Sequence, residues 1–326
     1  MKTRDVALAG CGALGAAVAV KMLTRAETVN WDDCRKDIAH SDRSCFVNVD
    51  GIRFHYQEFG GVADPPMILI HGYTASVYVW KTVAPMLADK GFHVIAVDLV
   101  GFGWSEKPRW FDYSIQAQAR VIAHFMKRLE IEPAVIVGNS YGGAIALDLT
   151  LEHPDLVDKL VLVDPVTNDE PKNHPILRLV SFRGVGEILT PFIANSHLIM
   201  RSRMQKTLAP ANHYLITKER MSAIRRPLNS AEGHHSLLAT SRNWSADHLE
   251  REAHRVAQPT LIIWGEDDKV IPIKGGYKLH SEMQNSRLVV LKDCGHVPPE
   301  EKSELFTEVV SDFCGREKVK NIGNAR

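Results

Sequence analysis

This sequence has no excess of charge of either sign and no cysteine motif. Its 39 lysines and arginines balance 39 aspartates and glutamates, and no basic stripe stands out. A nucleic acid is therefore not an expected partner, and a small or apolar molecule fits better. The five cysteines are an odd number without Cys-x-x-Cys spacing, so neither a zinc site nor a disulfide framework is predicted. They are Cys11, Cys34, Cys45, Cys294 and Cys314.

Long apolar runs are also scarce, with one exception near the beginning of the chain. Residues 6–23 are rich in Ala, Gly, Val and Leu and are interrupted only by Lys21. The run nearly reaches the length of a membrane span but is weakly hydrophobic. A membrane anchor, an uncleaved signal and a soluble or buried helix all stay open, as does a lipoprotein cleavage box at 8–11. Segment 1–43 is therefore set apart, and the protein is expected to be either membrane-associated through residues 6–23 or cytoplasmic.

Short apolar runs that alternate with helical patterns indicate an α/β fold. Helical patterns separate most of the runs, and an Asp-Gly turn at 50–51 joins the first two into a hairpin. The expected strands are 45–49, 52–59, 67–70, 94–97, 135–137, 160–163, 261–264 and 288–291, and the clearest helices are 80–90, 115–129, 143–152 and 302–313. Such strands predict a mostly parallel central sheet with helices on both faces.

The alternation stops between residues 166 and 256. This stretch has irregular apolar clusters, many basic residues and five prolines, at 171, 175, 191, 210 and 227. It is typical of a largely helical insertion. Because it leaves one strand and returns to the next, we expect it to cover the carboxyl edge of the sheet, where open α/β folds bind ligands. The predicted domains are a core at 44–165 and 257–326 and a helical cap at 166–256.

A Gly-x-Ser-x-Gly motif at 138–142 follows a predicted strand directly. An apolar run ends at Gly138, Ser140 comes next but one, and a helical pattern begins just after Gly142. A serine on a sharp strand-to-helix turn exposes its hydroxyl above the sheet edge, and the following helix directs its amides toward a developing oxyanion. The motif therefore predicts that Ser140 is a nucleophile.

A serine nucleophile needs a base, and the base needs an acid that orients it. Asp268 follows the expected strand 261–264, and His296 follows the expected strand 288–291, so both leave the same sheet edge as Ser140. We expect Asp268 to be the acid and His296 the base. Asp267 beside it and Asp164, after strand 160–163, stay open as alternative acids.

The order Ser, Asp, His and its placement after successive strands resemble the α/β-hydrolase fold family, in its serine esterase and lipase branch with a cap. Segments 69–73, 98–108, 153–155 and 265–272 are similar to the family's oxyanion loop, structural turn, helix end and acid loop. The resemblance implies that the backbone amides of Tyr73 and Tyr141 form the oxyanion hole. Their rings are expected to line the pocket, and His71 to brace its loop rather than act as a base.

A serine in the turn disfavours relatives that use an aspartate there, such as haloalkane dehalogenases and epoxide hydrolases. We expect hydrolysis of a small-molecule carboxylic ester with a lipophilic or medium-length acyl chain, as in carboxylesterases or monoacylglycerol lipases, with no cofactor or metal. A carbon–carbon bond hydrolase of ring-cleavage products is the alternative, because Gly-Asn-Ser-x-Gly-Gly also resembles that group. A ligand receptor on the same fold is the alternative from another class. The oligomeric state is not predicted.

Overall fold

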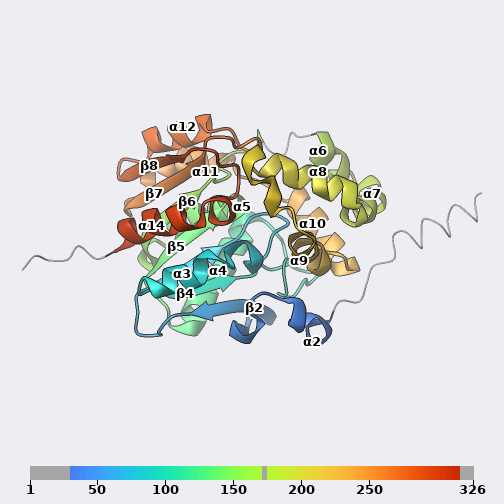
Figure 1. Ribbon diagram of the computed structural model, residues 1–326, viewed down its shortest axis with the longest axis horizontal. Coiled ribbons are helices and arrows are strands. Elements are labelled where there is room, and N and C mark those ends of the chain that lie inside the picture. Colours follow the sequence, from blue (N-terminus) through green and yellow to red (C-terminus); the bar gives the residue numbers. More distant parts are fainter. Residues whose placement is uncertain (1–29, 171–174, 316–326) are drawn as a thin grey trace, which may run out of the picture.

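The computed structural model describes residues 30–170 and 175–315, and an eight-stranded sheet forms its centre (Figure 1). The strand order is β1-β2-β4-β3-β5-β6-β7-β8. The strands are β1 (Ser44–Val49), β2 (Ile52–Phe59), β3 (Pro66–Ile70), β4 (His93–Val97), β5 (Ala134–Asn139), β6 (Val157–Val163), β7 (Thr260–Gly265) and β8 (Ser286–Leu291). Only the pairings β1–β2 and β2–β4 are antiparallel. The expected mostly parallel sheet is confirmed.

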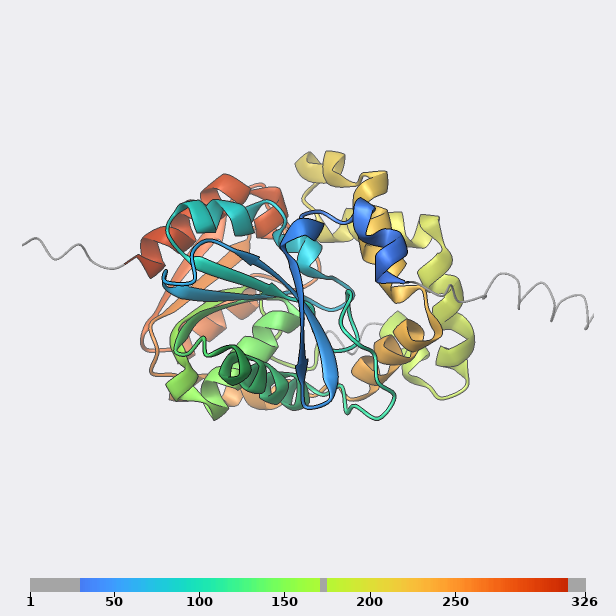
Figure 2. The same ribbon diagram turned by 90° about the horizontal axis from the view of Figure 1, so that it is seen from below.

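Both faces of the sheet are buried, as the continuous apolar strands predict. On β3, Met67 and Leu69 belong to one core cluster and Ile68 and Ile70 to the other, and all four are 0% exposed. One face is covered by α4 (Ile115–Leu129), α5 (Tyr141–Glu152) and α12 (Lys274–Glu282). The other is covered by α3 (Val83–Asp89) and α14 (Ser303–Cys314), so the sheet lies between two helical layers (Figure 2).

The helix boundaries follow the sequence patterns closely in three places. Helix α4 has the expected bounds, α5 begins two residues earlier than its pattern, and α14 begins one residue later. Turn helices η3 (Val77–Trp80), η4 (Pro154–Leu156) and α13 (Pro298–Glu301) precede α3, β6 and α14. Helix α12 was not predicted, because Gly275 and Gly276 weaken its helical pattern. Gly276 lies there so close to Trp264 that a Cβ would be 2.6 Å from the indole ring.

The described part of the chain between β6 and β7 is largely helical, as the sequence predicts. It contains α6 (Pro175–Ser181), α7 (Val185–Asn195), α8 (His197–Thr207), η6 (Pro210–Leu215), α9 (Lys218–Leu228), α10 (Ala231–Arg242), α11 (Asp247–Glu252) and η7 (Ala253–Arg255). Helices α6 to α10 gather at one end of the molecule, at the right of Figure 1. We propose that residues 166–256 act as one cap over a core formed by 44–165 and 257–326.

The described chain begins beside this cap. Helix α2 (Trp31–Cys34) is followed by η1 (Arg35–Asp37) and η2 (Ser41–Arg43), and this segment runs past the cap helices (Figure 2). The Asp37 carboxylate pairs with Arg226 of α9 at 2.8 Å. The candidate anchor at residues 6–23 lies outside the described residues. Among the helices that are described, none combines the length and the apolar character needed to cross a bilayer.

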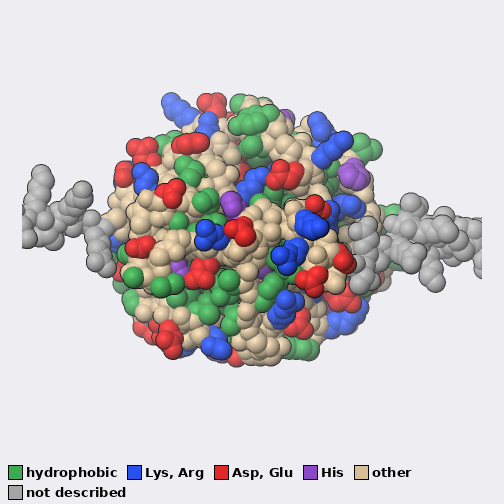
Figure 3. Space-filling model, turned by 60° about the horizontal axis from the view of Figure 1, so that its bottom comes forward, with side chains coloured by type: hydrophobic (Ala, Val, Ile, Leu, Met, Phe, Trp, Pro, Cys, Tyr) green, Lys and Arg blue, Asp and Glu red, His purple; other side chains and the backbone are tan. Residues whose placement is uncertain are grey.

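The face drawn in Figure 3 shows no field of a single charge among the described residues. On the face drawn in Figure 3, lysines and arginines alternate with aspartates and glutamates and with small apolar areas. This distribution agrees with the balanced composition and gives a polyanion no continuous basic track on that face.

Candidate active site

Ser140 lies on a strained turn between β5 and α5. Its backbone has φ 57° and ψ −117°, a conformation that is costly for a residue with a side chain. The turn is possible because its two glycines allow close contacts. A Cβ on Gly138 would lie 2.3 Å from the Gly142 carbonyl oxygen, and one on Gly142 would lie 2.2 Å from the Ile70 carbonyl oxygen. The sequence motif thus produces the sharp strand-to-helix turn that it predicts.

The three residues expected to act together are in contact. The His296 Nε2 atom lies 2.8 Å from the Ser140 hydroxyl oxygen, and the His296 Nδ1 atom lies 2.7 Å from Oδ2 of Asp268. The other carboxylate oxygen of Asp268 accepts the backbone N–H groups of Val270 and Ile271, at 2.7 and 3.0 Å. Those two bonds fix the carboxylate, so its second oxygen can orient the imidazole.

The two alternative acids do not make this contact. The backbone N–H of Asp267 donates to the Cys294 carbonyl, and His296 bonds to Asp268 instead. Asp164 is fully buried behind Asp268, and its Oδ1 accepts the Gly265 backbone N–H at 2.9 Å. Burial, followed by the charge of Asp268, raises the pKa of Asp164 well above its usual value. Asp164, Asp268 and His296 offer ligand atoms within 4.8 Å of one another, the one such grouping of possible metal ligands in the described chain.

The loop after β3 passes directly beside Ser140. A Cβ on Gly72 would lie 3.1 Å from the Ser140 Cβ and 3.5 Å from its hydroxyl oxygen. The loop therefore passes the nucleophile at Gly72, and Tyr73 is the next residue. Tyr141 is the first residue of α5, and the first amides of a helix have no carbonyl partner inside it. In these positions, the backbone N–H groups of Tyr73 and Tyr141 are suited to donate hydrogen bonds to a negatively charged oxygen.

The tyrosine rings join the core to the cap. The Tyr141 ring is fully buried and packs on Trp244 with centroids 5.1 Å apart, while its hydroxyl donates to the Tyr113 carbonyl at 3.2 Å. The partly exposed Tyr73 also packs on Trp244, at 6.1 Å, and donates to the Leu237 carbonyl of α10 at 3.0 Å. Tyr141 is therefore a packing residue, and Tyr73 reaches the cap.

His71 braces the oxyanion loop and does not contact Ser140. Its Nδ1 bonds to the Gly72 carbonyl at 2.8 Å, and its Nε2 accepts the Leu99 backbone N–H at 3.1 Å. Burial lowers the pKa of His71, which favours the neutral form that these two bonds require. His71 thus holds the loop after β3 to the loop after β4.

Glu301 holds the loop that carries His296, a role that the sequence analysis missed. Its buried carboxylate accepts backbone N–H groups of Gly295 at 3.0 Å and Val297 at 3.2 Å on either side of His296. It also accepts the Ala209 N–H and the Asn212 side-chain amide of the cap, both at 2.8 Å. A glutamate five residues after the predicted base was the available signal, and in the structure it is the last residue of α13.

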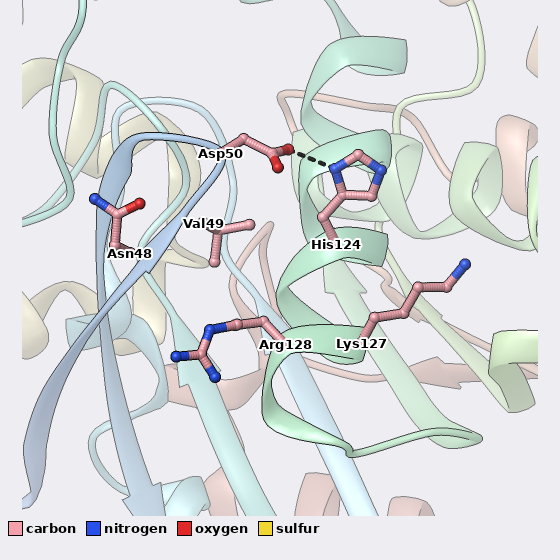
Figure 4. A pocket seen from close by; sticks show the side chains of 6 residues that line it. All are labelled: Asn48, Val49, Asp50, His124, Lys127 and Arg128. Atoms are coloured by element: carbon pink, nitrogen blue, oxygen red, sulfur yellow. Dashed lines mark hydrogen bonds and ion pairs between the residues drawn. The ribbon is translucent and has the colours of Figure 1, made fainter.

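Two hollows on the surface lie apart from Ser140. One is lined by residues of the β1–β2 hairpin and of α4, and its His124 pairs with Asp50 (Figure 4). The other lies between residues 37–39, η3 and α9. Neither lining includes Ser140, His296 or Asp268, so we assign no catalytic role to either hollow.

Known proteins share this architecture and are similar to this chain in sequence. The profile of the alpha/beta hydrolase fold family matches residues 65–303. An uncharacterized hydrolase, YugF, from Bacillus subtilis (strain 168) is 30% identical over 272 residues, covering 81% of this chain and 95% of the relative.

Two further relatives have named activities. A 2-hydroxy-6-oxo-2,4-heptadienoate hydrolase from Pseudomonas putida is 29% identical, with 83% of this chain and 96% of the relative covered. The crystal structure of a membrane phospholipase A superposes with a TM-score of 0.71 at 25% identity, covering 96% of this chain and 98% of that one. With its strand order, its strained serine turn and these similarities, the chain belongs to the alpha/beta hydrolase fold family.

Proposed function

We propose that the protein hydrolyses carboxylic esters through an acyl-enzyme. Ser140 is the nucleophile, His296 is the general base, Asp268 orients the imidazole, and the amides of Tyr73 and Tyr141 stabilise the oxyanion. The observation that carries the proposal is the continuous hydrogen-bonded path from Ser140 through His296 to Asp268, at 2.8 and 2.7 Å. A nucleophilic role for Ser140 explains why this serine is held in a strained turn at the end of that path.

The chemistry has two halves. The Ser140 oxygen attacks the ester carbonyl while His296 takes the hydroxyl proton, and the tetrahedral oxyanion accepts hydrogen bonds from the two amides. The C–O bond to the alcohol then breaks, and His296 returns the proton to the leaving oxygen. A water molecule repeats the sequence on the acyl-serine, releasing the acid and restoring the hydroxyl of Ser140.

We propose a lipophilic acyl chain as the substrate's main feature. The aromatic rings of Tyr73 and Trp244 pack together where the cap meets the oxyanion loop, and one similar structure, covering 96% of this chain, is named a membrane phospholipase A. Apolar rings beside the nucleophile favour an apolar acyl group, because its burial removes that surface from water.

Carbon–carbon bond hydrolysis is the second candidate, since four of the similar enzymes are named as hydrolases of oxo-dienoic or related acids or of a semialdehyde. One feature of this chain favours it. Arg203 of α8 lies with a guanidinium nitrogen 3.5 Å from the Thr74 hydroxyl, in the loop that passes Ser140. Burial raises the pKa of Tyr73 to about 12, and the charge of Arg203 opposes that rise. A cation at this place would attract the carboxylate of an oxo-dienoic acid.

The test compares both substrate classes on the same preparations. We expect the unaltered protein to hydrolyse p-nitrophenyl esters from acetate to palmitate, with an optimum beyond acetate, and to leave a vinylogous diketone acid largely intact. Ser140→Ala should abolish turnover, whereas Ser281→Ala, at an exposed serine of α12, should not change it. Rapid cleavage of the diketone acid, lost in Arg203→Met but kept in Arg201→Met, would replace the ester assignment by the second candidate.

A further inference from the structure

Asp164 and Asp268 form a buried carboxyl pair at the ends of neighbouring strands. Asp164 directly follows β6, and Asp268 lies in the loop after β7, which pairs with β6 in parallel. Asp164 is 0% and Asp268 8% exposed, and their oxygens lie within the same 4.8 Å grouping as His296. Two carboxyl groups that lie this close together and are this well shielded from water cannot both be ionised without a large free-energy cost.

The hydrogen bonds distinguish the two partners. Asp268 uses both oxygens as acceptors, for His296 on one side and for the amides of Val270 and Ile271 on the other. Asp164 has one oxygen bonded to the Gly265 amide, while its Oδ2 is buried without any partner in the structure as described. An unpaired buried carboxylate oxygen is costly, whereas a protonated one becomes a donor. The proton therefore belongs on Oδ2 of Asp164.

We infer that Asp164 is a positioning residue that stays protonated and donates a hydrogen bond to the carboxylate of Asp268. This inference rests on the proposed function, because it concerns the acid that orients His296. The pair then carries one negative charge, and that charge sits on the member that contacts the imidazole. Asp164 acts through Asp268, and because its side chain is fully buried it has no surface to offer a substrate.

The groups around Asp164 support a neutral acid. Asp268 and His296 face Asp164 from the loops after β7 and β8. The charge of Glu301, at the end of α13, and the thiol of Cys294 also lie close enough to influence it. Two of these neighbours are carboxyl groups, which disfavour a further negative charge. Burial raises the pKa of the Cys294 thiol, so that group stays neutral as well.

Two variants separate this role from the alternatives. Asp164→Asn keeps the geometry, because the amide oxygen can accept from Gly265 and the amide nitrogen can donate to Asp268. Asp164→Ala removes the donor. The readout is the rate at which a fluorophosphonate labels Ser140 in the full-length protein, followed from about pH 5 to about pH 10. Labelling reports the Ser–His–Asp array and does not depend on turnover of any ester.

We expect Asp164→Asn to label within about threefold of the unaltered protein, with the acid limb of its pH profile unmoved, and Asp164→Ala to label about 10- to 100-fold more slowly. If Asp164 were ionised, Asp164→Asn would remove a negative charge beside His296, and the acid limb would move down by about one pH unit or more. That shift, or a loss in Asp164→Asn as large as in Asp268→Asn, would overturn the proposal. Labelling without ester turnover would count against the ester assignment alone.

Discussion

At the scale of single residues, neighbouring groups decide which of two similar carboxyl groups orients the base. Asp268 and Asp164 leave adjacent strands at the same edge, yet only Asp268 bonds to His296. Asp268 also receives two backbone amides, which stabilise its charge. Asp268 is therefore suited to carry the charge, because it contacts an imidazole and two amides, whereas Asp164 contacts only one amide, through one oxygen.

Asp268→Asn tests that distinction. The amide would orient His296 in the wrong tautomer, so we expect kcat to fall by about 10³- to 10⁴-fold with the fold intact. Asp267→Asn is the matched control and should retain activity. Steady-state kinetics with thermal unfolding of both variants measures the effect. If kcat fell equally in Asp268→Asn and Asp267→Asn, or fell only in Asp164→Asn, Asp268 would not be the residue that orients His296.

Asp98 provides a test of stability against pH. Burial alone would raise the pKa of this carboxyl, but the hydrogen bond and charge of His55 and the backbone N–H of Trp104 bring it below its usual value. A lowered folded pKa means that Asp98 stabilises the fold fully above about pH 4 and loses that contribution as the pH falls through the folded value.

We therefore expect Asp98→Asn to cost roughly 3–5 kcal/mol at neutral pH, because His55 loses its buried partner, and to cost less as the solution is acidified below about pH 4. Chemical denaturation at several pH values measures this difference. Asp89→Asn, at an exposed aspartate of α3, is the control and should have little effect. If the loss of unfolding free energy in Asp98→Asn grew on acidification, the lowered pKa of Asp98 would be contradicted.

At the scale of elements, Glu301 links the His296 loop to the cap. Its carboxylate holds Gly295 and Val297 in the loop and Ala209 and Asn212 in the cap. We expect Glu301→Gln to lower kcat about tenfold or more, because the amide replaces one acceptor oxygen by a donor that faces other donors. Glu304→Gln, on the exposed face of α14, should leave kcat unchanged. Unchanged kinetics in Glu301→Gln would show that the loop is held by other bonds.

The elements that the sequence predicted are those that a local pattern determines. The central strands β3, β4, β5 and β7 are short apolar runs buried on both faces, and α4 has one buried stripe and a serine cap, so their positions could be found without tertiary information. Helix α12 was missed because Gly275 and Gly276 have low helix propensity, and packing on Trp264 overrides it. The individual cap helices have no such repeating pattern.

The site was predictable to the extent that its residues follow strands. Ser140, Asp268 and His296 were found because parallel strands bring the residues after them to one edge. The closeness of Asp164 to Asp268 could not be predicted, because it depends on β6 and β7 being neighbours in the sheet. The role of Glu301 depends on the cap segment that meets it, which no local pattern places.

At the scale of the whole molecule, a buried ion pair joins the cap to the core. Arg220 of α9 forms two hydrogen bonds with Glu300 of α13, at 2.6 and 2.8 Å, and both side chains are less than a tenth exposed. Removing one partner leaves a buried charge, so we expect Arg220→Met to cost roughly 3–5 kcal/mol. The double variant with Glu300→Met should recover most of that loss.

A double-mutant cycle by chemical denaturation measures the coupling. The control pair is Lys81 and Glu219, which also bridges core and cap at 2.9 Å but is more exposed, and its coupling should stay below about 1 kcal/mol. Additive losses in the cycle for Arg220 and Glu300 would show that this pair does not hold the cap to the core.

The central claim is that Ser140 carries the acyl group during turnover, and acid quenching followed by peptide mass analysis tests it most directly. The full-length protein is mixed with a p-nitrophenyl ester and quenched within the first turnovers. We predict a mass increase equal to one acyl group on the peptide that contains Ser140, and no increase in Ser140→Ala. Steady hydrolysis with no acylated peptide, and with the same rate in Ser140→Ala, would contradict the account.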